Sequence, residues 1–425
     1  MSALLIFGLL FALMLTGMPI SISLGLTVLT FLFTMTRVPI ESVGLKLFSG
    51  LDNFGIMAIP FFILAGSFLT RGGVARRMIN FTTSLVGHWP GGLGLAGVAA
   101  CALFAAICGS SVATVAAIGS IILPAMVQQG FPKRFGAGVV TTSGALGILV
   151  PPSIILVLYG VSTNTSIGTL FMAGIVPGVI LAFMLASVTW FIAWRKNYPR
   201  LPRATWRERL NALHDGIWGL MLVVLVLGGI YSGIFTPTEA AAVAAVYSFV
   251  ITVFVYRELK LSEVPKNAAN LSAMLLYIIT NAVLFSFLMT HEQIPQVMAA
   301  WIVEQHFSVW VFLFVVNVIL LLAGNVMDPS SILLIMAPIL FPLAVNLGVN
   351  PIHLGILMVV NMEVGLCHPP VGLNLYVGSG IAKMGISEIT IAVLPWLCAM
   401  LIFLFMVTYI PEISLWLPQT LGVLR

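Results

Sequence analysis

The chain has 425 residues, of which 60% are hydrophobic and 7% are charged, and its formal net charge is +5. So few charged side chains cannot cover a water-facing surface of this size, which excludes a soluble globular protein and indicates an integral membrane protein. The basic residues are clustered, which is typical of an orientation signal for a bilayer rather than of a nucleic-acid surface.

Apolar stretches long enough to cross about 30 Å of hydrocarbon recur along the chain. At roughly 20 residues per span plus connections, we expect about ten to twelve full or partial crossings. The first stretch, residues 1–35, has no basic residue before it and no small-residue cleavage pattern, so we expect a retained span rather than a signal peptide. The apolar blocks lie near 3–36, 54–70, 93–129, 136–193, 217–256, 271–290, 300–347, 353–381 and 389–413.

A polar interval, residues 195–209, separates the chain into two halves. It holds Arg195, Lys196, Arg200, Arg203, Arg207 and Arg209 against the single acid Glu208. Lys and Arg concentrate in cytoplasmic connections, so we expect this interval on the cytoplasmic side.

The two halves repeat each other around the pattern Gly-x-x-x-Pro-Pro. Without a gap, Pro124, Val127, Gly130, Gly147, Pro151, Pro152 and Gly160 register with Pro342, Val345, Gly348, Gly365, Pro369, Pro370 and Gly378. The basic residues of the first copy have no counterparts near 291–297 or 351–352, so the positive-inside rule predicts that the copies are inverted. Two broken helices in inverted repeats are typical of the binding site of a secondary transporter.

This pattern predicts an all-α polytopic membrane protein with five parts. We expect N-terminal scaffold spans over 1–50, a first repeat over 51–194, a basic cytoplasmic connector with scaffold or arm helices over 195–270, a second repeat over 271–388, and a last span over 389–425. The first repeat would hold a re-entrant hairpin near 93–129 and a broken helix over 136–160. The second would hold a hairpin near 310–347 and a broken helix over 353–381.

Each repeat has a polar segment inside apolar sequence, at 109–114 and at 325–331, and the register places Ser110 on Asp328. Backbone that leaves helical geometry at membrane depth must be buried in protein or line a wet cavity, so we expect these segments at the tips of the hairpins. Asp328 inside a membrane is a functional-site hypothesis by default. The alternative is that Asp328 caps the helix that follows Pro329.

The Pro-Pro breaks supply a second set of polar groups, because proline in a helix frees the carbonyls of the preceding turn. Such carbonyls bind hard cations. We predict one cation site from the carbonyls of Gly147 and Val150 with the Ser110 hydroxyl, and a second from the carbonyls of Gly365 and His368 with the Asp328 carboxylate. Proline kinks also occur for packing alone, but two copies in register favour binding.

Polar side chains near the breaks are the expected substrate ligands, although any one of them could instead bridge helices. The set comprises Ser111, Thr114, Thr142, Ser143, Ser153, Asn361 and Asn374. Amides at the N-termini of half-helices bind anions, so no Arg cluster is required.

Other residues have separate interpretations. Thr236, Pro237 and Glu239 match a capping box, so we expect a structural role for Glu239. Glu363 is a hypothetical proton-carrying group without an acidic counterpart in the first copy. The four cysteines are isolated in apolar sequence, and we assign them no chemistry.

The chain resembles the large membrane subunit of tripartite ATP-independent periplasmic (TRAP) transporters. The resemblance rests on Gly-Ser-Ser-Val-Ala-Thr-Val-Ala-Ala at 109–117, Gly-Ile-Leu-Val-Pro-Pro-Ser at 147–153, Leu-Phe-Met-Ala-Gly at 170–174, Phe-Thr-Pro-Thr-Glu-Ala-Ala at 235–241 and His-Pro-Pro-Val-Gly-Leu-Asn at 368–374. It implies two partners, a small membrane subunit of the DctQ type and a periplasmic substrate-binding protein of the DctP type. It also implies sodium-driven uptake of an organic acid, no cofactor besides the coupling ions, and elevator motion of a transport domain against a scaffold.

The resemblance also implies sodium sites at Ser110, Gly147, Val150 and Pro152, and at Asp328, Gly365, His368 and Pro370. Sialic-acid and sugar-acid members often carry Asp where this chain has Thr114, so the sequence is more similar to the C4-dicarboxylate branch. His368 departs from the family pattern, where Thr is common. We therefore predict the large subunit of a sodium-coupled importer of succinate, malate and fumarate in a bacterial inner membrane.

Three alternatives stay open. One is an importer of sialic or sugar acids from the same family, and another is a stand-alone sodium-coupled anion carrier that needs no binding protein. The third is an intramembrane hydrolase with Ser110 or Ser111 as nucleophile, for which no His or Lys base stands at a suitable place.

Overall fold

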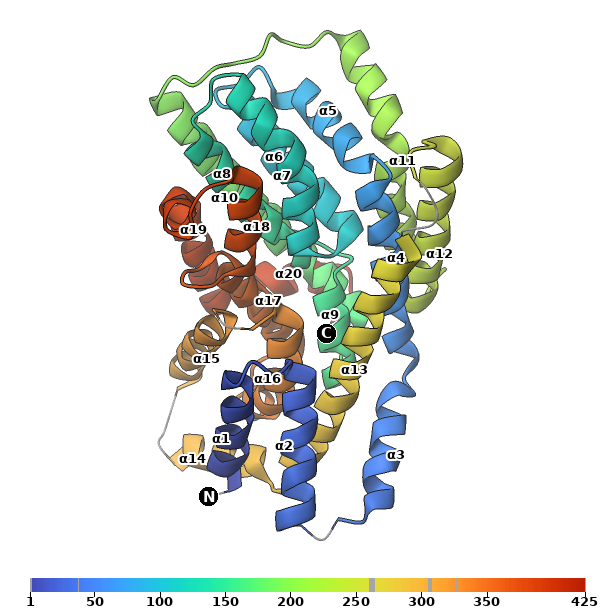
Figure 1. Cartoon of the computed structure of the whole chain (residues 1–425), viewed down its shortest axis with the longest axis vertical. Coiled ribbons are helices and arrows are strands. Elements are labelled where there is room, and N and C mark those ends of the chain that lie inside the picture. Colours follow the sequence, from blue (N-terminus) through green and yellow to red (C-terminus); the bar gives the residue numbers. More distant parts are fainter. Residues whose placement is uncertain (1, 37, 260–263, 305–307, 326, 425) are drawn as a thin grey trace.

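The computed structural model describes residues 2–36, 38–259, 264–304, 308–325 and 327–424. Throughout these residues the chain forms helices and connections, without a strand (Figure 1). Eight helical segments are long and apolar enough to cross a membrane, and six shorter apolar helices accompany them in the described part of the chain. The expectation of an all-α polytopic membrane protein is thereby confirmed.

The first half begins with helices that precede the predicted hairpin. In order they are α1 (Ser2–Leu15), α2 (Ile20–Met35), α3 (Ile40–Leu51), the 3-10 turn η1 (Phe54–Met57), α4 (Ala58–Arg71) and α5 (Val74–Val86). The elements of the polar segment and the first break follow as α6 (Gly92–Cys108), α7 (Ser111–Gln128), α8 (Lys133–Ser143), the 3-10 turn η2 (Gly144–Ile148), α9 (Ile154–Thr163) and α10 (Ile167–Arg195).

The second half has a similar succession. It comprises α11 (Trp206–Tyr231), α12 (Pro237–Val250) with a π-helical end η3 (Ile251–Val255), α13 (Val264–His291), α14 (Ile294–Glu304), α15 (Val309–Gly324), α16 (Pro329–Asn346), α17 (Pro351–Cys367), α18 (Leu373–Ala382), α19 (Ile386–Tyr409) and α20 (Glu412–Thr420). A short apolar helix followed by an 18-residue helix occurs in both halves, as α6–α7 and as α15–α16.

Two long helices begin at capping boxes. Thr236 accepts a hydrogen bond from the amide of Glu239 at 3.3 Å, and the Glu239 carboxylate accepts one from the amide of Thr236 at 2.8 Å. Thr205 and Glu208 make the same pair of bonds at the start of α11. Each box satisfies amides that a helix N-terminus leaves free, so the structural role predicted for Glu239 is confirmed.

The basic connections gather at one end of the molecule. Figure 1 places the α7–α8 turn at the top, where the chain also crosses from α10 to α11, and the α4–α5 turn lower down in the upper part of the molecule. These connections carry Arg71, Lys133 and Arg195. This is the end that the positive-inside rule predicts to be cytoplasmic.

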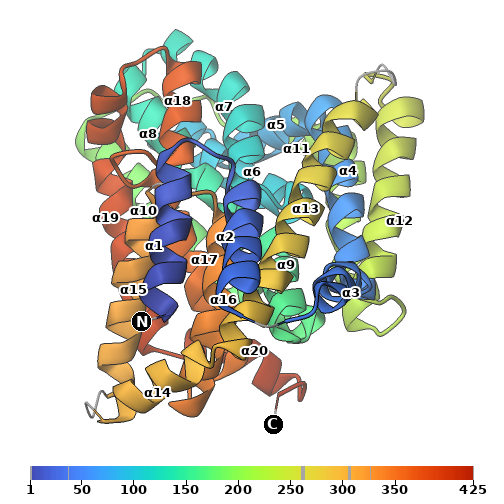
Figure 2. The ribbon, with the colours of Figure 1, turned by 60° about the horizontal axis from the view of Figure 1, so that its bottom comes forward.

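Helices far apart in the sequence pack together. α18 lies against α7 and α8, α19 lies against α8 and α10, and α13 runs beside α2, α3 and α4 (Figures 1 and 2). Large apolar side chains on the outside stay uncovered, including Leu15, Phe183 and Trp206, which are 89%, 73% and 76% exposed. Such surfaces are stabilised by lipid rather than by water. Inside the bundle the two broken helices meet, since α17 packs against η2 and α9.

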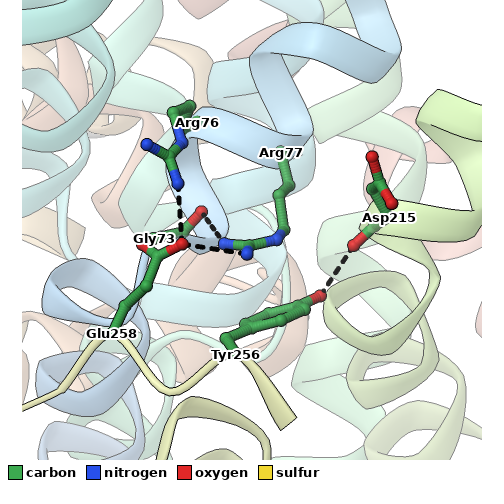
Figure 3. A network of polar contacts seen from close by, with 6 residues as sticks. All are labelled: Gly73, Arg76, Arg77, Asp215, Tyr256 and Glu258. Atoms are coloured by element: carbon green, nitrogen blue, oxygen red, sulfur yellow. Dashed lines mark hydrogen bonds and ion pairs between the residues drawn. The ribbon is translucent and has the colours of Figure 1, made fainter.

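A polar network joins α5 to the connection after η3 at the basic end (Figure 3). Glu258 accepts ion pairs from Arg76 at 2.6 Å and from Arg77 at 2.9 Å. The Arg77 guanidinium lies 3.7 Å from the ring centre of Tyr256, whose hydroxyl donates to the carbonyl of Asp215 on α11. Burial raises the pKa of Tyr256 to about 12, and the neighbouring Arg77 charge opposes that rise. The network fixes α5 against α11 and the end of α12.

Candidate transport site

The first break lies directly against the turn between α6 and α7. Gly109 ends α6 with φ of 63°, in the left-handed region that favours glycine. A β-carbon added at Gly147 would lie 2.7 Å from the carbonyl oxygen of Ser110, and one added at Gly109 would lie 3.0 Å from that of Pro152. Ser110, Gly147 and Pro152, which the family resemblance assigns to one sodium site, are thus neighbours in space.

The carbonyl oxygen of Ser110 already accepts hydrogen bonds from the first turn of α7. It accepts the amide of Thr114 at 3.1 Å and the Thr114 hydroxyl at 2.8 Å. The Ser110 hydroxyl makes no capping bond to α7. The side chain of Val150 packs toward Gly178 on α10, so only its backbone is suited to the cation site.

The second break lies against the end of α15. Gly365 and Gly324 approach so closely that a β-carbon on either would lie 3.1 Å from the α-carbon of the other. The His368 ring nitrogen Nδ1 is 2.9 Å from Oδ1 of Asn325, which is the first residue after α15. The Pro151–Pro152 and Pro369–Pro370 peptide bonds are both cis. Sequence reasoning missed Asn325 as a partner of the break, although it had placed this residue in the polar segment.

Asp328 has the capping role that the sequence analysis held as the alternative. Its carboxylate accepts the amide of Ser331 at 3.1 Å and the Ser331 hydroxyl at 2.6 Å, which caps α16. Pro329 occupies the first helical position, where its missing N–H costs nothing. Capping leaves lone pairs on both carboxylate oxygens, so it is compatible with a cation ligand as well.

The predicted substrate residues Asn374 and Ser111 touch. The Asn374 side-chain amide donates to the Ser111 hydroxyl at 2.7 Å and lies 3.4 Å from the carbonyl of Thr141, and both side chains are buried. Cys367 donates toward the same Thr141 carbonyl at 3.6 Å. This polar cluster, Ser111, Thr141, Cys367 and Asn374, brings α7, α8, α17 and α18 together.

Three buried side-chain atoms on α8 and α18 lack a hydrogen-bond partner among the described residues. They are the hydroxyl oxygens of Thr141 and Ser143 and Oδ1 of Asn374. Buried polar atoms without a protein partner normally pair with water or a ligand. Sequence reasoning missed Thr141 and selected its neighbour Thr142, whose hydroxyl donates to the carbonyl of Gly138 in its own helix.

Two other predicted substrate residues bond elsewhere. The Ser153 hydroxyl donates to the carbonyl of Ile148 at 2.5 Å and caps α9. The Asn361 amide donates to the carbonyl and to Oδ1 of Asn317 on α15, and Asn317 in turn donates to the Thr408 hydroxyl on α19. Both residues connect elements around the breaks rather than joining the polar cluster.

Glu363 is buried on α17 with 0% exposure, and neither carboxylate oxygen has a hydrogen-bond partner within the described ranges. The backbone amide of Leu149, in the first break, lies nearby. The Glu363 side chain, which belongs to the second repeat, thus lies beside the break of the first repeat. Its proton-carrying role stays a prediction.

Cation and nucleophile chemistry can be assessed from the same geometry. In the part of the chain that the structure describes, no three His, Cys, Asp or Glu side chains converge as a metal site. A cation at the breaks would therefore use carbonyl and hydroxyl oxygens with the single Asp328 carboxylate, which are hard ligands.

Ser110 and Ser111 have no hydrogen bond to His or Lys in the same described part, so neither resembles an activated nucleophile.

Comparison with known proteins decides the family. The model of the family described as tripartite ATP-independent periplasmic transporter, DctM component, matches residues 7–413. The chain belongs to this DctM family. The DctM-family chain is 67% identical to the C4-dicarboxylate TRAP transporter large permease protein DctM of Rhodobacter capsulatus, over 100% of both chains. It is 53% identical to the protein of the same name from Pseudomonas aeruginosa, over 94% of this chain and 95% of the relative.

A solved structure shares the fold of this DctM-family chain. The YdaH transporter of Alcanivorax borkumensis superposes with a TM-score of 0.60 at 14% identity, covering 88% of this chain and 89% of that one. The family match and the apolar helices show that the DctM-family chain is a multi-pass membrane protein and the large permease subunit of a TRAP transporter. Membership in a tripartite family implies that it works with other subunits.

Proposed function

We propose that this chain is the large permease of a sodium-coupled, binding-protein-dependent importer of C4-dicarboxylates, such as succinate, malate and fumarate, in a bacterial inner membrane. The observation that carries the proposal is the buried contact between Asn374 and Ser111, which joins the second broken helix to the start of α7. The names of the two relatives support the substrate class.

The substrate carboxylates are assigned to the polar cluster. Ser111 is the first residue of α7, and the free amides of a helix N-terminus attract anions. The hydroxyls of Thr141 and Ser143 have no partner among the described residues, and each can donate a hydrogen bond to a substrate carboxylate. A dicarboxylate would thus be held by hydroxyls and amides rather than by Arg.

Two sodium ions are assigned to the breaks. The first uses Ser110, Gly147, Val150 and Pro152, and the second uses Asp328, Gly365, His368 and Pro370. The close approach of Gly147 to Ser110 supports the first site, and the approach of Gly365 to the end of α15 supports the second. Each ion would neutralise part of the negative charge that the substrate brings into the membrane.

Transport is assigned to an elevator motion. The transport domain would contain the re-entrant hairpins α6–α7 and α15–α16 with the broken helices that follow, related as inverted repeats. The repeated order of elements and the packing of α18 on α7 and α8 support a single moving body. The N-terminal helices with α11 and α12 would belong to the scaffold, which a DctQ-type small subunit enlarges and on which a DctP-type binding protein delivers substrate.

The test is uptake of labelled succinate and labelled sialic acid into proteoliposomes that hold this chain, its small subunit and its binding protein. Sodium-driven succinate uptake is the expected result. Uptake of sialic acid instead would assign the chain to another branch, and uptake without a sodium gradient would overturn both cation sites. Uptake without the binding protein would favour a stand-alone carrier.

A further inference from the structure

A groove with a volume of about 980 Å³ opens at the basic end of the molecule, between α8, α10 and α19. Arg134 lines it from the start of α8, and Arg195 and Lys196 line it from the end of α10. Ile391 and Trp396 on α19 form its opposite wall. The groove therefore has a cationic end and an apolar wall.

The cationic end is only partly neutralised. Arg134 donates through Nε to Glu388 at 2.8 Å, which leaves the terminal nitrogens of the guanidinium available. Arg195 and Lys196 make no ion pair within the described ranges. One acid thus faces three bases around this opening.

The wall is apolar and open to the bilayer. Phe191 on α10 and Ile391 on α19 are 51% and 59% exposed, and both line the groove. The indole nitrogen of Trp396, in the same wall, donates to the Thr189 hydroxyl on α10 at 2.8 Å. Trp190 and Trp194 stack on α10 just before the basic residues Arg195 and Lys196, as expected at a membrane interface.

We propose that this groove binds an anionic phospholipid of the cytoplasmic leaflet. Its phosphate lies between Arg134, Arg195 and Lys196, and an acyl chain runs along Phe191 and Ile391. Basic pockets between membrane helices on the cytoplasmic side fit anionic headgroups, and the clustered Lys and Arg residues place this end of the molecule there. A free anion would leave the apolar wall uncovered, and a neutral lipid would leave the three bases without a counter-charge.

The bound lipid would stabilise the packing of α8 on α19. A β-carbon added at Gly138 on α8 would lie 2.5 Å from the carbonyl of Ala392 and 2.6 Å from the Trp396 ring, so these helices are in direct backbone contact beside the groove. Gly138 is one turn before Thr141 of the polar cluster. The lipid site therefore lies behind a helix of the proposed substrate site.

The experiment compares melting temperatures of the purified complex of this chain and its small subunit in nanodiscs of phosphatidylcholine, with and without added phosphatidylglycerol. We expect phosphatidylglycerol to raise the melting temperature, and the double variant Arg195→Gln with Lys196→Gln to lose about half of that rise or more. The matched control, Arg200→Gln with Arg203→Gln, removes the same charge from the same connector outside the groove and should keep the rise. Ser187→Trp fills the exposed side of the groove without changing its charge and should also reduce the rise.

Four results would overturn the proposal. The first two are a melting temperature in phosphatidylcholine alone as high as with phosphatidylglycerol, and an equal rise on adding inorganic phosphate. The third is an equal loss of the rise in the groove variants and in the control variant. The fourth is that the Arg195 and Lys196 double variant keeps the lipid effect but loses the small subunit. The last would identify the groove as a protein interface. None of these readouts depends on transport, so they are independent of the proposed substrate.

Discussion

The side-chain amide of Asn374 donates a 2.7 Å hydrogen bond to the hydroxyl of Ser111 across 263 residues of sequence. One residue follows the second Pro-Pro break, and the other begins the helix after the first polar turn. Both are buried, and Oδ1 of Asn374 has no partner among the described residues. This bond links the two repeats at the point where we place the substrate.

Replacing Asn374 should therefore impair transport more than folding. Asn374→Ala leaves the Ser111 hydroxyl buried without its partner, and an unsatisfied buried group costs about 1–3 kcal/mol. We expect a roughly fivefold to 140-fold loss of the specificity constant for succinate, by the relation of about 1.4 kcal/mol to a factor of ten. Initial uptake rates over a range of succinate concentrations measure it.

The control for Asn374 is Asn361→Ala, which removes a buried amide of the same type that bonds Asn317 on α15 instead. We expect Asn361→Ala to lower the melting temperature while changing the apparent succinate affinity little. Equal effects of the two variants on affinity would argue against the polar cluster as the substrate site.

Two substitutions of Asp328 can separate its capping role from the proposed cation binding. Asp328→Asn keeps a side-chain oxygen for the amide of Ser331 but removes the negative charge, so we expect a melting temperature near that of the wild type and loss of sodium-dependent uptake. Asp328→Ala removes both functions and should also cost about 1 kcal/mol of stability. Uptake as a function of sodium concentration, with thermal unfolding in parallel, distinguishes the two. Wild-type sodium dependence in Asp328→Asn would leave Asp328 with a capping role only.

The sequence predicted correctly those features of the candidate site that depend on local backbone chemistry. Repetition in register identified both breaks, and the residues that follow them, Ser153 and Asn374, because proline and glycine act through the local backbone. The capping box at Thr236 and Glu239 was predicted correctly for the same reason, since its bonds span only three residues.

What could not be predicted is which residues of one helix face the polar groups of another. Thr141 and Thr142 are adjacent and chemically identical, yet only Thr141 presents its backbone to Asn374 and Cys367. The distinction depends on how α18 packs against α8, a contact between distant parts of the chain. The same holds for Asn361, whose partner Asn317 no local pattern indicates, and for Glu363, whose approach to the first break needs the tertiary fold.

Gly147 should tolerate no side chain. Its added β-carbon would meet backbone atoms of Ser110, which cannot rotate away as a side chain can. We expect Gly147→Ala to cost about 1–3 kcal/mol of stability through overpacking and to weaken sodium activation, because the break would move away from Ser110. Gly228→Ala on α11 is the matched control, since a β-carbon there meets nothing within 4 Å. A Gly147→Ala variant with the sodium activation curve of the wild type would separate this contact from ion binding.

The network in Figure 3 predicts unequal roles for two adjacent arginines. Both pair with Glu258, but the Arg76 side chain is 58% exposed, whereas that of Arg77 is 18% exposed, stacks on Tyr256 and donates to the carbonyl of Gly73 at 3.1 Å. Exposed ion pairs contribute about 0–1 kcal/mol, and a desolvated cation–π contact adds up to about 2 kcal/mol. We therefore expect Arg77→Gln to lower the melting temperature clearly and Arg76→Gln to change it little, with the Arg76 effect vanishing in high salt because screening acts mainly on exposed charges. Equal destabilisation by the two variants at low salt would show that Glu258, rather than the stacking of Arg77 on Tyr256, holds α5 against the end of α12.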